Sequence, residues 1–390
     1  MKHDVIVVGA RCAGASTALL LARQGRRVLL VDKAVFPSDT LSTHYVHASG
    51  VARLKRWGVV DEIARSGCPP IPSVQFDFDP LVIRGTPPPL DGVSHAYAPR
   101  RAVLDQILVR EALKAGVEWR EAFTLEELIV QEGRVVGIRG HHRGGAPVTE
   151  RAGLVVGADG RYSRVAELVG AAAYHERPPL TCMYYSYWSG VSLDRIEIYV
   201  RERRSLLAFP THAGLTVVVA VWPHREFAAV QRALEKEFLA ALELAPSLAE
   251  RVRAGVREEP FRGTGDLPNR FRKAFGPGWA LVGDAGCHKD PLVAQGIMDA
   301  FRDADLLAAA GDDLAEYARR RDEAALDMYE LTCQRAALEP PPPEMVALLA
   351  AIRENQSAID QFVGVDAGTV PVREFFSPEN VRRLTAMGPT

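Results

Sequence analysis

The fold is decided by Asp4–Lys33, which reads DVIVVGARCAGASTALLLARQGRRVLLVDK. Its first apolar run predicts a buried parallel strand, because a strand that is covered on both faces has no solvent-facing positions. Gly9 then turns the chain, and the apolar residues after Gly14 follow helical spacing until Gly25. A second apolar strand ends at Asp32. The stretch therefore predicts a strand–turn–helix–strand unit with an acid at its end.

A unit of this kind suits a dinucleotide. The free N–H groups and the positive dipole end at the start of the helix attract a pyrophosphate, and a carboxylate after the second strand can accept hydrogen bonds from a ribose. This stretch contains both strands, the glycine turn, the helix and the acid at the expected spacing. The combination favours nucleotide binding over a purely structural turn. The residues that we expect at the ligand are Gly9, Arg11, Cys12, Ala13, Gly14, Asp32 and Lys33.

Arg11 stands where the middle glycine of the G-x-G-x-x-G pattern is usual. That glycine lets the backbone approach the pyrophosphate, so the Arg11 side chain has to leave along the open side of the crevice. It then either neutralises the pyrophosphate or reaches the loop that follows the second strand. Because the start of the helix already provides donors for the phosphates, we expect Arg11 to lie nearer the loop than the adenine end of the ligand.

The composition is that of a globular enzyme. The chain has 390 residues, 47% hydrophobic and 25% charged, with a net charge of −2, so nothing indicates nucleic-acid binding. Its five cysteines form no CxxC pair and no metal-binding spacing with histidine, and we expect a reduced, cytoplasmic chain without a metal. No apolar run reaches the roughly 18 residues that span a bilayer. A buried strand starting at Asp4 argues against a signal peptide.

The remaining sequence alternates between two patterns. Proline-rich segments with short alternating strands leave the nucleotide domain, and strands that end in glycine–acid pairs return to it. We expect an α/β fold: a Rossmann-like nucleotide domain, an inserted β-sheet substrate domain and a helical C-terminal segment. The nucleotide domain comprises residues 1–70, 99–173 and 272–313; the substrate domain comprises 71–98 and 174–271, mostly antiparallel sheet interrupted by a helix at about 226–242; the helical segment is 314–390.

Two places offer candidates for a reaction site. The loop Phe36–His47 is rich in Ser, Thr, Pro and His and follows the second strand, so His44 and His47 should lie near the ligand crevice. A hydrogen-bonded loop histidine is the commoner role for each. Tyr185 belongs to an aromatic cluster, MYYSYWSG, in the expected sheet. It either lines a pocket under that sheet or packs in the core.

Three separated motifs occur in a specific order: GARCAG, then GADGRYS at Gly157–Ser163, then GDAGCHKDPLVAQGI at Gly283–Ile297. Together they resemble the FAD-dependent monooxygenase superfamily with the p-hydroxybenzoate hydroxylase fold, whose relatives include geranylgeranyl reductases and flavin halogenases. The resemblance implies that the nucleotide domain binds FAD without a covalent link.

By the same resemblance, the first part of the chain holds the adenosine half of FAD. Gly9 and Gly14 match residues that hold the diphosphate, and Asp32 matches the acid on the ribose. Arg101 matches an arginine that contacts FAD, and Leu125 falls near the adenine.

The later motifs match the flavin half. Asp159 and Gly160 resemble an acid–glycine pair linked to both flavin and nicotinamide nucleotide. Asp284 resembles the carboxylate that binds the ribitol chain, while Pro291 and the Gly296–Ile297 backbone would lie beside the isoalloxazine.

The resemblance implies a monooxygenase: NAD(P)H reduces the FAD, and O2 then hydroxylates an apolar or aromatic small molecule through a flavin hydroperoxide. No second nucleotide unit is visible, so NAD(P)H would bind transiently. The alternatives are a flavin-dependent C–C reductase or dehydrogenase and a non-redox, FAD-bound cyclase. The absence of a Trp-x-Trp-x-Ile-Pro segment argues against a halogenase, and FPSDTLSTH replaces the Cys-bearing loop of geranylgeranyl reductases. The sequence leaves open a monomer or a homodimer.

Overall fold

The opening stretch forms β1 (Val5–Val8), α1 (Cys12–Arg23) and β2 (Val28–Val31), as predicted. The structure, a computed structural model, describes residues 2–386. Both strands are buried throughout, and they pair in parallel with Val5 opposite Val28. The two apolar runs therefore lie side by side in a sheet that is covered on both faces.

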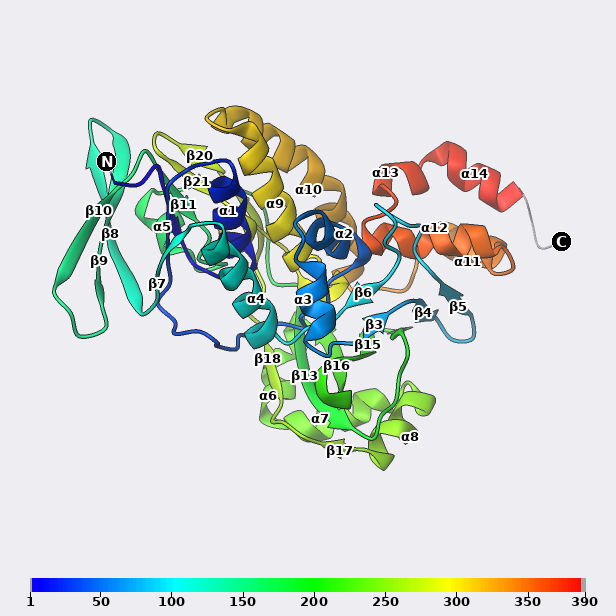
Figure 1. Cartoon of the computed structure of the whole chain (residues 1–390). Coiled ribbons are helices and arrows are strands. Elements are labelled where there is room, and N and C mark those ends of the chain that lie inside the picture. The colour runs from blue at the N-terminus through cyan, green and yellow to red at the C-terminus, as the bar shows by residue number, and fades with distance from the viewer. Residues whose placement is uncertain (1, 387–390) are drawn as a thin grey trace.

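A six-stranded sheet contains these two strands, in the order β20 (Phe275–Gly276), β21 (Trp279–Leu281), β11 (Leu154–Gly157), β1, β2 and β7 (Glu118–Arg120). Residues of β1 alternate between its two faces. Val5 and Val7 pack in the layer that contains α1, α4 (Arg101–Lys114) and α9 (Gly296–Ala310). Ile6 and Val8 pack against a separate three-stranded sheet of β8 (Phe123–Gln131), β9 (Arg134–His142) and β10 (Pro147–Arg151), which projects from the molecule (Figure 1).

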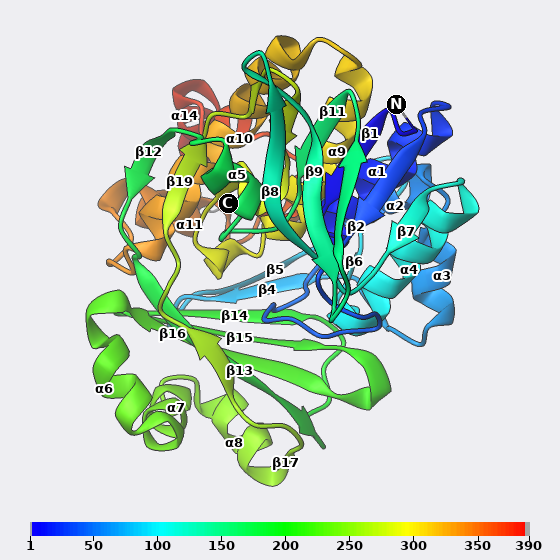
Figure 2. The same ribbon diagram turned by 90° about the vertical axis from the view of Figure 1, so that its left-hand side faces the viewer.

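A second, eight-stranded sheet runs in the order β17 (Val256–Arg257), β13 (Thr181–Ser189), β16 (Thr216–Pro223), β15 (Arg204–Pro210), β14 (Ile196–Arg201), β4 (Val74–Asp77) and β5 (Val82–Gly85), and β18 (Arg262–Thr264) also pairs with β13. Val74 lies opposite Ile196 in a parallel pairing of β4 with β14. Two segments that are far apart in the chain therefore share one sheet, which lies on one side of the part that contains the six-stranded sheet (Figure 2).

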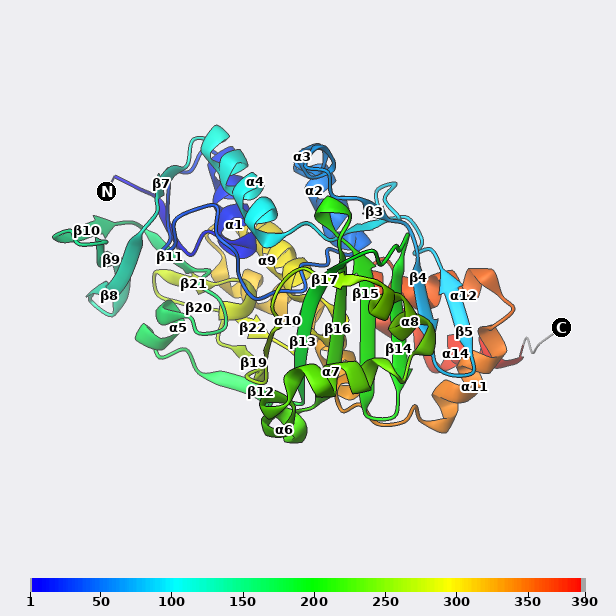
Figure 3. The same cartoon turned by 90° about the horizontal axis from the view of Figure 1, so that it is seen from below.

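The two faces of this sheet have different neighbours. Tyr184 and Trp188 pack against the helices on the outer face, whereas Tyr185 and Tyr187 lie on the inner face in one cluster with Tyr45 and residues of the C-terminal helices. The single helix expected at about 226–242 is wrong in detail, because Ala233 adopts φ −135° and ψ 41° and divides it. The outer face carries α6 (Phe227–Arg232), α7 (Leu234–Leu242) and α8 (Pro246–Ala254), as Figure 3 shows, and the short turn η2 (His224–Glu226) precedes α6.

Smaller elements connect the two parts. They are α2 (Ala48–Arg56), α3 (Val60–Arg65), α5 (Arg164–Leu168), the pair β3 (Pro70–Ile71) and β6 (Ala96–Tyr97), and a sheet of β12 (Ala173–Arg177), β19 (Asn269–Arg272) and β22 (Cys287–His288). Three short helical turns complete this set: η1 (His212–Gly214), η3 (Gly283–Ala285) and η4 (Pro291–Val293).

The chain ends in helices, as predicted: α10 (Leu314–Ala336), α11 (Pro343–Ile352), α12 (Gln356–Ala367), α13 (Val372–Phe375) and α14 (Pro378–Ala386). Leu348 of α11 and Phe362 of α12 pack in one apolar cluster with Phe76 of β4. The C-terminal helices thus cover part of the inner face of the eight-stranded sheet. The predicted fold class is confirmed. No helix within residues 2–386 is long and apolar enough to cross a bilayer.

Candidate functional site

A cavity of about 650 Å³ lies where the three sequence motifs meet, between the ends of β1 and β2 and the eight-stranded sheet. This volume is within the range of small-molecule sites. Of the cofactor residues expected from the sequence, all but Gly14 line it: Gly9, Arg11, Cys12, Ala13, Asp32, Lys33, Arg101, Leu125, Asp159, Gly160, Asp284, Pro291, Gly296 and Ile297. The structure therefore brings residues from three parts of the chain to one cavity wall.

The turn after β1 requires its two glycines. Gly9 has φ +98°, and a Cβ on it would lie 2.5 Å from the Ala158 carbonyl oxygen. A Cβ on Gly14 would lie 1.7 Å from the carbonyl oxygen of Gly9. Gly14 is thus buried beneath the turn, which is why it does not line the cavity. The close packing leaves the start of α1 open to a ligand.

Asp32 holds the same turn from the other side. One carboxylate oxygen accepts the Ala10 N–H at 2.7 Å, and the other accepts the Ala34 N–H at 2.8 Å. A carboxylate has about four acceptor positions, so Asp32 keeps capacity for ribose hydroxyls. The acid that the sequence assigned to a ligand also fixes the backbone around it.

Asp159 is committed to the start of α5. Its Oδ2 accepts the N–H groups of Arg164 at 2.7 Å and Val165 at 3.2 Å, and its Oδ1 accepts the Ser163 hydroxyl. Burial raises the pKa of Asp159. Gly160 turns the chain here with φ +83°. The backbone of this motif therefore lines the cavity, while the Asp159 carboxylate is already hydrogen-bonded to the start of α5.

Asp105 is a residue that the sequence reasoning missed. Its side chain is fully buried; one oxygen accepts Arg11 Nη1 at 2.8 Å, and the other accepts Arg101 Nη2 at 3.0 Å and the Cys12 thiol at 3.3 Å. Burial raises the pKa of Cys12, so this thiol stays protonated. The available signal was the spacing of Arg101 and Asp105, four residues apart on one helix.

Arg11 reaches the loop Phe36–His47, on the side that we expected. Its Nη1 donates to the Ser38 carbonyl at 3.2 Å, and its Nη2 donates to the Ser38 hydroxyl at 3.0 Å and the Asp39 carbonyl at 3.2 Å. From the opposite sheet, Arg262 binds the Asp39 carboxylate at 2.6 Å. Arginines from both parts of the molecule therefore hold this loop at the cavity.

The third motif places an acid beside a helix start. Asp284 lies in η3, and its Oδ1 is 3.8 Å from the position that a Cβ on Gly296 would take. Between them, Pro291 begins η4, and Ala294 adopts a left-handed conformation with φ +53°. This conformation is costly for alanine, and such strain concentrates at functional segments. Ala294 lines the cavity together with the first residues of α9.

His44 lines the cavity, but both of its ring nitrogens are occupied. Nδ1 lies 3.0 Å from the Ala98 carbonyl oxygen, and Nε2 lies 3.0 Å from the Tyr187 hydroxyl. The carbonyl can only accept, so Nδ1 carries the proton and Nε2 accepts from Tyr187. Burial lowers the pKa of His44 to about 3. The side chain is therefore neutral at ordinary pH and shapes the site rather than exchanging protons.

The other two reaction-site candidates differ in position. His47 is buried outside the cavity lining, with Nε2 3.0 Å from the Val293 carbonyl oxygen. Tyr185 lines the cavity, and its hydroxyl accepts the Ser42 N–H at 3.2 Å. Tyr185 thus joins the sheet to the 36–47 loop, while His47 supports the segment before α9.

Two further residues of the wall belong to the third motif. His288 and Lys289 precede Pro291 and line the cavity. The Lys289 ammonium is buried and forms an ion pair with Asp299 in the first turns of α9. In the sequence Lys289 stands between His288 and Asp290, but its ion-pair partner lies ten residues away on a helix face that only the folded chain defines.

A family model described as an FAD binding domain matches residues 2–339. The chain therefore belongs to this family of FAD-dependent oxidoreductases. The resemblance stated from the three motifs is confirmed.

Relatives in this family carry different activities. The chain is 27% identical to a tryptophan 2-halogenase of Chondromyces crocatus over 78% of its own length and 60% of that protein. It is 28% identical to a 6-methylpretetramide 4-monooxygenase of Streptomyces rimosus, covering 82% of the chain and 77% of the relative. It is also 28% identical to digeranylgeranylglycerophospholipid reductase 2 of Methanothermobacter thermautotrophicus, covering 85% and 83%.

Solved structures show the same fold. A flavoprotein/dehydrogenase from Cytophaga hutchinsonii superposes with a TM-score of 0.83 at 18% identity, covering 98% of each chain. The myxobacterial chondrochloren halogenase superposes with a TM-score of 0.78 at 23% identity, covering 99% of this chain and 96% of that one. At these identities the similarity defines the architecture, and the reaction has to be argued from the site.

Proposed function

We propose that this flavoenzyme is a monooxygenase that uses NAD(P)H and O2 to hydroxylate an apolar or aromatic small molecule. The observation that carries the proposal is an apolar recess that continues the cavity under the eight-stranded sheet. It shares Thr43, Tyr45, Met183, Pro291 and Ala294 with the cavity. A substrate in this recess would contact the strained segment before α9. The family resemblance implies that the flavin ring lies beside the same segment.

The recess is almost entirely hydrocarbon. Beyond the shared residues it is lined by Ile196, Leu207, Phe209, Val219 and Leu292. Its free volume is about 10 Å³, close to the space that one water molecule needs. An aromatic substrate would therefore enter by displacing side chains. The same close packing keeps water away from the reacting atoms, which protects reactive oxygen chemistry from wasteful side reactions.

The cavity has the features that FAD requires. Gly9 and the start of α1 would receive the diphosphate, Asp32 the ribose, and Asp284 the hydroxyls of the ribitol chain. Bound FAD would supply the electron transfer and the reaction with O2. The flavin would be held without a covalent bond: Cys287 is buried and outside the cavity lining, and His44 has both ring nitrogens occupied.

The side chains of the recess contribute binding and exclusion of water. His44 lines the adjoining cavity, is neutral and is hydrogen-bonded at both nitrogens, so it would hold the 36–47 loop in place without exchanging protons with the substrate. The similarity to a 6-methylpretetramide 4-monooxygenase supports a monooxygenase activity for this chain.

The test begins with the FAD-loaded protein under anaerobic conditions. Reduction by NADH or NADPH is followed by absorbance, and O2 is then admitted with phenols and other aromatic compounds of increasing size. We expect NAD(P)H oxidation to be stimulated by one class of compound, with one atom from labelled O2 in the product. Reduction of a C–C double bond without O2 would instead indicate a reductase, and product formation without any reductant would indicate a cyclase.

A matched pair of variants tests the recess. Phe209→Ala removes a ring that lines the recess, whereas Phe238→Ala removes a ring from the outer helices of the same sheet. Both rings are buried, so both variants should lose stability. Only Phe209→Ala should shift the preferred substrate toward larger molecules. An equal shift in both variants would place the substrate elsewhere.

A further inference from the structure

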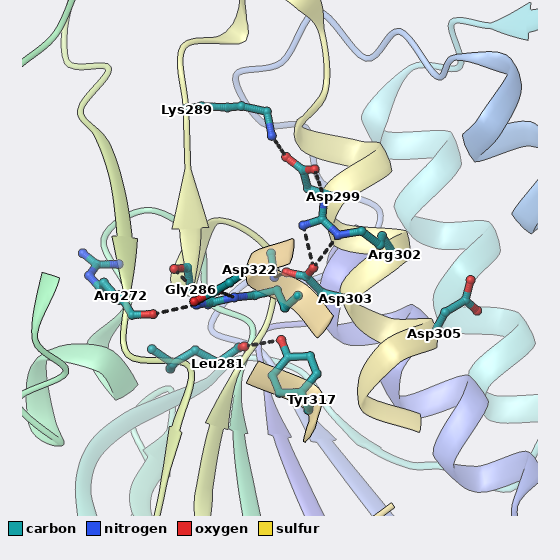
Figure 4. A network of polar contacts seen from close by, with 12 residues as sticks. Arg272, Leu281, Gly286, Lys289, Asp299, Arg302, Asp303, Asp305, Tyr317 and Asp322 are labelled. Carbon is teal, nitrogen blue, oxygen red and sulfur yellow. Dashed lines mark hydrogen bonds and ion pairs between the residues drawn. The ribbon is translucent and has the colours of Figure 1, made fainter. Parts of the chain in front are cut away.

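The segment that carries Asp284 is tied to α9 and α10 on both sides of the acid (Figure 4). Before it, the Tyr317 hydroxyl donates to the Leu281 carbonyl at 2.6 Å. Beside it, the Gly283 N–H donates to Asp303 Oδ2 at 3.0 Å. After it, Arg321 Nη1 donates to the Gly286 carbonyl at 3.2 Å.

The three side chains that make these contacts are fully buried: Asp303, Tyr317 and Arg321. Each replaces a hydrogen bond that the backbone of a turn would otherwise make to water. Arg321 also donates to the Arg272 carbonyl at 3.0 Å and the Tyr174 hydroxyl at 2.8 Å. The Asp284 turn is therefore held by side chains from two helices. All of these hydrogen bonds can form together only when the turn lies within a narrow range of positions.

A chain of charges extends the network to the next segment. Asp303 pairs with Arg302 at 2.8 Å, Arg302 with Asp299 at 2.6 Å, and Asp299 with Lys289 (Figure 4). These buried charges alternate in sign, which avoids the penalty of an unpaired charge. Buried ion pairs add little net stability compared with apolar packing. Their effect here is geometric, since they fix both the Asp284 turn and the Lys289 loop to α9.

Asp284 itself takes no part in the network. Among residues 2–386, none donates a hydrogen bond to its carboxylate, whereas Asp299 and Asp303 are both engaged. The carboxylate faces the cavity with its acceptor positions available. A free acceptor on a rigidly held turn is suited to a row of hydroxyl groups at fixed positions, such as a polyol chain.

We propose that Asp303, Tyr317 and Arg321 are positioning residues that hold Asp284 for the ribitol chain of FAD. This rests on the FAD site of the proposed function, and it is independent of the reaction that follows. In this arrangement the C-terminal half of the chain contributes to cofactor affinity without touching the cofactor.

The test compares two buried tyrosines on α10. Tyr317→Phe removes the hydroxyl that binds the Leu281 carbonyl, and Tyr329→Phe removes the one that binds the His175 carbonyl, away from the Asp284 turn. Both variants should lower the Tm of the apoprotein to a similar degree. We expect the FAD dissociation constant to rise about fivefold in Tyr317→Phe and less than about twofold in Tyr329→Phe. The visible circular dichroism of the bound flavin should change only in the former.

A double-mutant cycle shows whether the effect passes through Asp284. In an Asp284→Ala background, Tyr317→Phe should no longer change the FAD dissociation constant. Equal FAD affinities in the two tyrosine variants, or an undiminished effect in the Asp284→Ala background, would overturn the proposal. Failure of the wild-type protein to bind FAD would overturn the cofactor assignment itself. A result against monooxygenation alone leaves this experiment unaffected, because it measures only cofactor binding.

Discussion

Arg11 and Asp105 form an ion pair of 2.8 Å that joins the GARCAG turn to α4. The same buried carboxylate binds Arg101, so one charge orients two guanidinium groups at the cavity wall. The second Nη of Arg11 reaches the 36–47 loop at Ser38 and Asp39. The residue that breaks the glycine fingerprint therefore connects the nucleotide turn, a helix and the loop at the cavity.

Arg11→Gly should restore the usual fingerprint and release the 36–47 loop. We expect the FAD dissociation constant to stay within about tenfold of the wild type, about 1.4 kcal/mol, because α1 and Arg101 remain. Turnover should fall by a larger factor, and proteolysis within the loop should become faster. The control is Arg26→Ala, which removes only an exposed ion pair with Asp312. Loss of FAD with normal turnover in the remaining holoenzyme would make Arg11 a phosphate clamp instead.

Asp284→Ala should weaken FAD binding by about 1–3 kcal/mol, since hydroxyls in the cavity would lose a charged acceptor. Flavin fluorescence during titration of the apoprotein measures this change. Asp305→Ala is the control: Asp305 lies on α9 but binds Arg53 and Trp57 on another face (Figure 4). If both variants kept wild-type affinity, the Gly–Asp turn would have no role in holding the cofactor.

Asp290 should make the protein more stable on mild acidification. Its carboxylate is fully buried and accepts the Thr181 hydroxyl at 2.6 Å. Burial raises its pKa from 3.8 to about 6, so the folded state holds a proton that the unfolded state has released. Above about pH 6 the buried carboxylate is ionised, which destabilises the folded state. Protonation of the carboxylate removes this destabilisation as the pH falls from about 6 toward 3.8. Between pH 7 and pH 5 this group should add about 1 kcal/mol to the free energy of unfolding.

Urea unfolding of wild type and Asp290→Asn at pH 7, 6 and 5 measures this contribution. The stability of wild type relative to the variant should increase as the pH falls, because asparagine does not titrate. A difference that is independent of pH would show that the folded-state pKa of Asp290 lies below this range.

His44 should have the opposite effect. Its folded pKa of about 3 lies below the ordinary value of 6.5, so unfolding takes up a proton at any pH between them. Stability from this group is complete above pH 6.5 and is lost as the pH falls toward 3, at about 1.4 kcal/mol per pH unit. His44→Gln should lower stability at pH 7.5 and narrow its difference from wild type at pH 5. A constant difference would mean that the pKa of His44 is the same in the folded and unfolded states.

Several features were predictable because they depend on local geometry. The turn at Gly9 needs a positive φ and close packing against Ala158. Glycine is the residue that best tolerates both, so its position in the sequence predicts such a turn. The same holds for the Gly283–Asp284 turn, since Gly283 has φ +58° and its Cβ would contact Ala13. The order of strands and glycine motifs was therefore enough to predict the fold class.

The parts that were not predictable depend on residues far apart in the sequence. Asp105 pairs with Arg11 across 94 positions, and its spacing from Arg101 on the same helix is equally compatible with an exposed ion pair. Asp299, Arg302 and Asp303 look like the polar face of an exposed helix, yet all three are buried or nearly so and pair with one another and with Lys289. His47 is a further example. Its ring pairs with the Val293 carbonyl in the segment before α9, and this tertiary contact could not be predicted from the sequence around His47.

The contact of Tyr317 and Arg321 with the Asp284 turn has a consequence for biosynthesis. The first strand of the site begins at Val5, but its last supports are on α10. A nascent chain therefore cannot complete the site until the ribosome has passed residue 321 and this helix has left the exit tunnel. At about 5–20 residues per second, the first glycine turn waits roughly tens of seconds for the rest of its site. FAD would then be captured only after Tyr317 and Arg321 have left the exit tunnel and packed against the Asp284 turn.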